Sequence, residues 1–146
     1  MYSCSDSKDS KFVLDSSLPV EVGIESLEVS VDGNAVINVY MINHNPVSGI
    51  QFQITPDNFF AIDSVFGGRA EDNDFALYSN KKGKILGFSM KGSHIPPSNS
   101  NNKKENLLFS AIATSLIEIN APIQIEPIIA DKDAKKMDFI SLPFSK

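Results

Sequence analysis

The sequence predicts an all-β fold: an antiparallel β-sandwich of about nine short strands. Short runs alternate between apolar and polar residues, most cleanly in residues 50–55, where Ile50, Phe52 and Ile54 share one face. Turn signals recur roughly every eight to twelve residues, a spacing typical of sandwiches. Asp32-Gly33 separates two such runs, and this dipeptide favours a tight hairpin. No internal repeat is visible, which argues against a propeller or solenoid.

The length and composition indicate one globular unit. The chain has 146 residues, 42% of them hydrophobic and ten of them Phe, so it can bury a sizeable core. We expect residues 1–10 to form a flexible polar leader and residues 11–146 to form a single sandwich domain. The net charge of −5 argues against a nucleic-acid partner. No run approaches the ~20 apolar residues of a membrane span.

The single cysteine, Cys4, lies in the polar leader and excludes an internal disulfide. A cysteine followed by such a Ser/Asp-rich tether resembles the start of a mature bacterial lipoprotein. This reading makes Cys4 a lipid-attachment site and places the domain outside the cell or on a surface. The alternative is that Cys4 is an incidental thiol.

The elements follow from alternation and turn chemistry. The expected strands are residues 24–31, 35–42, 50–55, 59–66, 75–79, 84–91, 107–119, 123–129 and 137–142, with a further short edge strand within 11–22. Pro19 suits an edge, where a missing N–H is tolerated. Residues 69–74 are expected to be a polar, acidic loop, and 98–105 an exposed, mobile loop.

Two of these segments need an explicit choice. In residues 84–91, Leu86, Phe88 and Met90 share one face, so we expect that face to pack on the core and the smaller, more polar face to look outward. Residues 107–119 could also form a helix with an apolar stripe. Their β-branched residues increase toward Ile119, which favours one long strand.

Sites for chemistry are few. His44 and His94 fall in loops expected to be exposed, without the spacing of a metal site. Glu71, Asp72 and Asp74 are a weak calcium candidate, although the EF-hand pattern is absent and a solvated turn is the alternative. No nucleophile–base motif or phosphate-binding loop is present, so we predict that the protein is not an enzyme.

A surface for a partner is the remaining possibility. Polar side chains on two strands would form a flat face if those strands share a sheet, and a tyrosine on a third strand could anchor a partner. The residues of this predicted partner-binding face are Tyr40, Gln51, Gln53, Thr55, Ser89 and Lys91. The alternative is an ordinary solvated sheet face.

Several segments together resemble the cohesin modules. Residues 49–54, following the strand that ends at Ile42-Asn43, resemble the part of cohesins that passes from one sheet into the next. Residues 83–97 resemble a later strand, 107–113 the strand after an insertion, and 128–133 with 137–142 a closing hairpin. The likeness covers about residues 24–142 and rests on order and spacing. It implies a nine-stranded sandwich of jelly-roll or immunoglobulin-like type, related to carbohydrate-binding modules, that holds a dockerin on one sheet face.

The sequence therefore favours a non-catalytic protein–protein interaction module resembling a cohesin, with a dockerin-like or assembly partner. The first alternative is a structural or decoration protein of a surface assembly, such as a virion or cell envelope. The second is a carbohydrate-binding module, disfavoured because the chain has no Trp and only three Tyr to stack on a sugar. No cofactor is expected apart from the weak calcium candidate.

Overall fold

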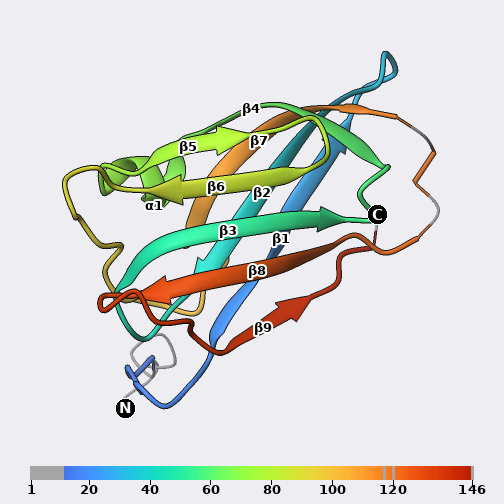
Figure 1. The fold of residues 1–146 in the computed structure, drawn as a ribbon. Helices are drawn as coiled ribbons and strands as arrows, with labels where there is room; N and C mark the ends of the chain where they lie inside the picture. Colours follow the sequence, from blue (N-terminus) through green and yellow to red (C-terminus); the bar gives the residue numbers. More distant parts are fainter. Residues whose placement is uncertain (1–11, 117, 120, 146) are drawn as a thin grey trace, which may run out of the picture.

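The computed structural model describes residues 12–116, 118–119 and 121–145, and they form a sandwich of two sheets (Figure 1). The first sheet contains, in spatial order, β4 (Phe60–Phe66), β7 (Leu107–Ser115), β2 (Asn34–Ile42), β1 (Val20–Val29) and β9 (Phe139–Leu142). The second contains β5 (Ala76–Ser79), β6 (Lys84–Phe88), β3 (Val47–Thr55) and β8 (Gln124–Asp131). The predicted all-β sandwich is confirmed.

The core lies between the two sheets and is built by strict alternation. From β3, Ile50, Phe52 and Ile54 point inward and are at most 2% exposed, as the sequence predicts. They meet residues of the first sheet, and the Phe52 and Phe109 rings lie 5.8 Å apart. Burying a large apolar side chain contributes about 1.5–3 kcal/mol, so each of these residues adds to the stability of the fold.

The β1–β2 hairpin forms at the predicted turn. Gly33 has φ 90°, a conformation that a side chain at this position would disfavour, and Ser30 N–H donates to the Asn34 carbonyl across the turn. Residues 107–115 form the strand β7, so the strand reading is correct and the helix alternative is wrong. The strand ends at Ser115, earlier than expected.

A single turn of helix, α1 (Gly68–Asp72), replaces the polar loop expected at residues 69–74. Arg69 points inward from it and donates hydrogen bonds to the carbonyls of Met41 (2.8 Å) and Pro96 (2.6 Å). Burial lowers the pKa of Arg69. The guanidinium thereby joins α1 to the end of β2 and to the loop after β6. This role could not be predicted from the sequence, because the residues beside Arg69 are mostly polar and suggest a solvated loop.

The loop expected at residues 98–105 is exposed at Asn99 and at residues 101–105, as predicted, but buried polar residues anchor it at its start and directly after its end. Ser98 is 3% exposed, and its hydroxyl donates to Asn43 Oδ1 and accepts the Asn43 N–H. Asn106 is also buried, and its side chain donates to the carbonyls of Ser100 and Asn102. The buried polar groups at these two positions are therefore hydrogen-bonded within the protein.

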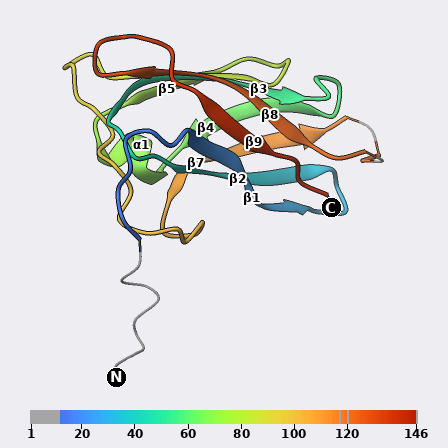
Figure 2. The same cartoon turned by 90° about the horizontal axis from the view of Figure 1, so that it is seen from below.

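The two ends of the described chain also differ from the sequence prediction. Residues 12–19 are irregular, and β1 begins at Val20, so the short edge strand expected within 11–22 is wrong. The closing hairpin expected from residues 128–133 and 137–142 forms at its turn, where the Met137 N–H donates to the Ile129 carbonyl, but the strand that follows, β9, does not continue it. Strand β9 crosses to the other sheet and pairs in parallel with β1, with Val20 opposite Phe139. Figure 2 shows β9 between the two layers, where it closes one side of the sandwich.

The single helix of the described residues is too short to cross a membrane.

Candidate functional site

The outer face of the β5-β6-β3-β8 sheet, hereafter the open face, carries large apolar side chains in solvent. Residues paired across the four strands form rows, and the middle row consists of Tyr78, Leu86, Gln51 and Ile128. The three apolar members are 52%, 41% and 45% exposed, respectively. Since neighbouring strands lie about 4.8 Å apart, this row places three apolar groups on a line roughly 14 Å long.

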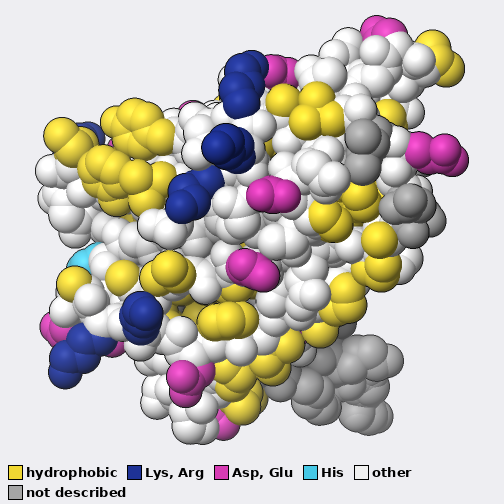
Figure 3. Space-filling view, turned by 45° about the vertical axis from the view of Figure 1, so that its right-hand side comes forward, with side chains coloured by type: hydrophobic (Ala, Val, Ile, Leu, Met, Phe, Trp, Pro, Cys, Tyr) yellow, Lys and Arg dark blue, Asp and Glu magenta, His cyan; other side chains and the backbone are white. Residues whose placement is uncertain are grey.

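The rows on either side of the middle row differ in chemistry. Toward one end of the face, the next row is apolar and, apart from Phe88, small; it is formed by Ala76, Phe88, Gly49 and Ala130. Phe88 stacks on Tyr78 with ring centroids 5.7 Å apart. Toward the other end, the row is polar and consists of Lys84, Gln53 and Glu126. Figure 3 shows hydrophobic side chains gathered over β5 and β6, with Lys side chains beside them.

The packing around Gly87 determines which side of β6 is exposed to solvent. A Cβ at position 87 would lie 2.9 Å from both Ile50 Cγ1 and Leu77 Cδ2, so the interior has no room for a side chain there. Ile85 and Gly87 therefore face the core, and Leu86 faces solvent. The sequence-based expectation that Leu86, Phe88 and Met90 pack inward is wrong. Met90 follows the end of the strand and is 82% exposed.

Three of the six predicted partner-binding residues share the open face. Gln51, Gln53 and Thr55 alternate with the buried residues of β3 and are half-buried. The Gln53 side chain donates to the carbonyls of Lys82 (2.8 Å) and Ile54 (3.0 Å). This contact fixes the amide near the β5–β6 turn.

Ser89 and Lys91 lie beyond β6, in the turn that follows it. The Ser89 hydroxyl accepts the N–H groups of Lys91 and Ser93, both at 3.1 Å, so it organises the turn. The Lys91 ammonium lies 3.7 Å from Asp74. These two residues lie at the margin of the open face instead of within a strand, because β6 ends at Phe88.

Tyr40 is not available as an anchor, because it lies on the other sheet and is 1% exposed. Its ring covers Gly23, where a Cβ would come within 2.9 Å of Tyr40 Cε1, and Lys103 Nζ lies 5.1 Å from the ring centroid. The hydroxyl donates to Glu21 Oε2 at 2.7 Å. Burial, and then the hydrogen bond and charge of Glu21, raise the pKa of Tyr40 well above its ordinary value.

The calcium candidates do not converge. Glu71 and Asp72 lie on α1, and Asp74 follows it with φ 66° and contacts Lys91. Within the described ranges, no three His, Cys, Asp or Glu side chains are placed to share a metal ion.

The two histidines differ in exposure. His94 is exposed as expected, whereas His44 is half-buried: its Nδ1 accepts the Asp15 N–H at 3.0 Å and its ring stacks on Phe12. Cys4, the lipid-attachment candidate, lies outside the described residues.

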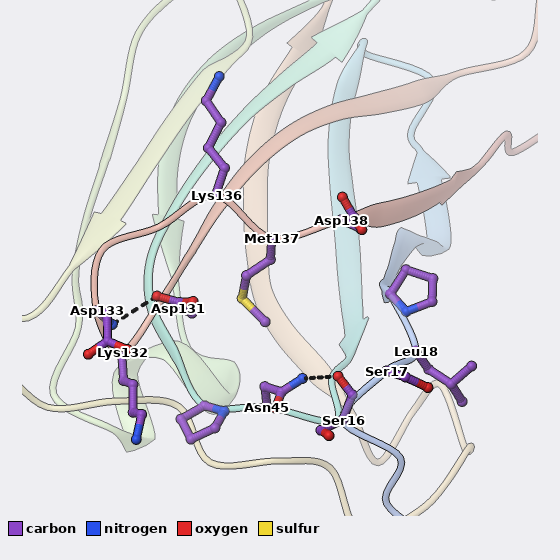
Figure 4. Close-up of a pocket in the computed structure, with 12 residues that line it drawn as sticks. Ser16, Ser17, Leu18, Asn45, Asp131, Lys132, Asp133, Lys136, Met137 and Asp138 are labelled. Carbon is purple, nitrogen blue, oxygen red and sulfur yellow. Dashed lines mark hydrogen bonds between the residues drawn. The ribbon is translucent and has the colours of Figure 1, made fainter.

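A cavity of about 310 Å³ lies at the end of the sandwich where the β8–β9 loop meets residues 16–19 and 45–46 (Figure 4). Its charged groups do not point at a common centre: Lys136 extends away from it, and Asp131 is engaged by its own turn. Asp131 Oδ1 accepts the N–H groups of Lys135 and Asp133, and these two hydrogen bonds lower the pKa of Asp131. The cavity therefore offers no assembled set of ligand-binding groups.

Comparison with known proteins supports the fold. No protein-family model matches the chain, and no curated protein matches it at the level of sequence. Among solved structures, it is similar to a non-cellulosomal cohesin from the hyperthermophilic archaeon Archaeoglobus fulgidus, with a TM-score of 0.58 and 12% identity over 88% of this chain and 93% of that one.

Two further similar structures are cohesins solved in complexes. The third ScaB cohesin of R. flavefaciens, in complex with a group 1 dockerin, has a TM-score of 0.53 and 14% identity over 88% of this chain and 96% of that one. A CaDoc0917–CaCohA2 complex gives a TM-score of 0.57 and 14% identity over 86% and 98%. The chain thus has a cohesin-like fold, as its segments suggested.

Proposed function

We propose that this protein is a non-catalytic interaction module that holds a partner protein on its open face. The observation that carries the proposal is the middle row, where Tyr78, Leu86 and Ile128 are each more than two-fifths exposed on a regularly paired sheet. Exposed apolar groups gathered on one face and rimmed by polar residues are typical of protein-binding surfaces.

The partner proposed is a dockerin-like protein, supported by the cohesin-like fold and by the dockerin present in one of the similar structures. The location proposed is extracellular or on a cell or virion surface, with Cys4 as a lipid anchor. Calcium is proposed as a condition of partner binding, to be tested by its presence and absence, and not as an ion held jointly by Glu71, Asp72 and Asp74. These finer statements rest on resemblance, whereas the face rests on the geometry described above.

The test compares two matched variants. Leu86→Lys places a charge in the middle row, and Ile112→Lys places the same charge on the outer face of the other sheet. The two side chains are 41% and 40% exposed, so both variants should fold equally well. Wild type and variants are immobilised and exposed to the lysate and secretome of the source organism, with and without calcium, and the retained proteins are identified.

We expect a protein that is retained by wild type and by Ile112→Lys, and whose retention falls at least tenfold with Leu86→Lys. Equal retention by both variants would refute the open face as the binding surface. Retention of an envelope or capsid component, or of the chain itself, would favour a structural role. If no protein is retained, the proposal fails, and glycan binding becomes the next function to test.

A further inference from the structure

The charges of the open face are segregated. Lys82 lies in the β5–β6 turn and Lys84 begins β6, whereas Glu126 lies on β8, at the opposite edge of the sheet. Among the described residues, ion pairs form only between Lys81 and Asp63 (2.7 Å) and between Lys91 and Asp74 (3.7 Å). The charges of Lys82, Lys84 and Glu126 are therefore not neutralised by a neighbouring side chain in this part of the chain.

Lys84 and Glu126 do not neutralise each other either. They share a row with Gln53 between them, so two strand spacings, roughly 10 Å, separate their backbones. No ion pair joins the two side chains in the structure. The row is consequently positive at its β6 end and negative at its β8 end, and it runs directly beside the apolar middle row.

The basic end of the row has the opposite sign to the net charge of the chain. The chain carries a net charge of −5, so an acidic partner would be repelled by the molecule as a whole and attracted by this end of the face. Charged groups at the margin of an interface contribute mainly to association rate, orientation and choice of partner, while the apolar centre supplies affinity. The row thus provides a means of fixing how a partner lies on the face.

We propose that the partner surface is itself polarised: it covers the middle row with apolar side chains, places carboxylates over Lys82 and Lys84, and places a basic group near Glu126. This inference rests on the proposed function, since it specifies the chemistry of the partner of the same face. It assigns Lys82, Lys84 and Glu126 as residues that determine specificity and orientation, and Leu86 as the centre of the contact.

The test uses a yeast-displayed library of one small helical scaffold, whose randomised surface carries Asp and Lys at equal frequency together with Leu, Tyr, Ser and Ala. Binders are selected on the wild-type chain and kept when Leu86→Lys abolishes their binding. Each is then measured against Lys82→Glu/Lys84→Glu and against the control Lys104→Glu/Lys136→Glu. Both double variants change the net charge from −5 to −9 at exposed lysines, because each substitution subtracts two charges.

We expect the Leu86-dependent binders to carry at least a threefold excess of Asp over Lys. Their affinity should fall tenfold or more with Lys82→Glu/Lys84→Glu and less than threefold with the control. Selection on Lys82→Glu/Lys84→Glu itself should reverse the excess in favour of Lys. Leu86-dependent binders without an Asp excess would overturn the charge inference and leave the proposed function intact. If no selected binder depends on Leu86, the open face itself fails as a binding surface.

Discussion

The outer faces of the two sheets have similar alternating sequences but use their side chains differently. On the β4-β7-β2-β1-β9 sheet, polar groups bind one another: Ser110 donates to Asn38, and Asn38 donates to Ser26, across three paired strands. Tyr40 is packed over Gly23 and beneath Lys103. On the open face, Tyr78 also points outward from its strand, but its side chain is 52% exposed.

This difference shows that an outward position in a strand is not the same as an available side chain. Both tyrosines alternate with core residues, yet only Tyr78 is free to contact a partner. Around Tyr40, the outer face of the first sheet contributes to stability, because this side chain contacts a glycine, a carboxylate and a lysine. The open face uses neighbouring positions for exposed apolar groups that contribute little to folding.

The largest expected effect separates the two tyrosines. Tyr40→Ala removes a buried aromatic ring and should lower the free energy of unfolding by about 3–5 kcal/mol. Tyr78→Ala removes a ring that is 52% exposed and should lower it by less than about 1 kcal/mol. Urea denaturation of both variants measures the difference. Equal losses would mean that the two faces do not differ in the way described.

A smaller effect separates the two sides of the four-stranded sheet itself. Gly87→Ala places a methyl group 2.9 Å from Ile50 and Leu77 in the core, and overpacking of this kind costs about 1–3 kcal/mol. Gly49→Ala, on the outer face, meets nothing closer than 3.9 Å and serves as the control. Thermal and urea unfolding should show a loss only for Gly87→Ala. A loss for Gly49→Ala alone would reverse the assignment of the two sides.

The smallest effect concerns the hydroxyl group of Tyr40. Tyr40→Phe removes its hydrogen bond to Glu21 and should cost about 1 kcal/mol at neutral pH. Because the folded state raises the pKa of Tyr40 above 10, the unfolded chain loses this proton first as the pH rises. The stability of the wild type should therefore fall above pH 10, and less steeply in Tyr40→Phe. Denaturant unfolding between pH 8 and 11 measures both slopes, and parallel slopes would contradict the raised pKa.

Local chemistry made part of the fold predictable. Asp32-Gly33 predicts its hairpin because the turn needs a positive φ, and residues 50–55 predict their strand because every second residue is apolar. Helix α1 was not predictable, since one turn is too short to show a 3.6-residue period and only one of its residues, Ala70, is buried and apolar. The parallel pairing of β9 with β1 joins residues more than a hundred positions apart, and no local pattern reports such a contact.

The sequence by itself determined that the chain is a β-sandwich, that β3 presents Gln51, Gln53 and Thr55 outward, and that residues 84–88 form a strand. Only the tertiary structure decided which side of that strand is exposed. Both sides of β6 carry apolar residues, so alternation separates them without ranking them. The choice depends on Ile50 and Leu77, which fill the space at Gly87 from neighbouring strands and leave Leu86 in solvent.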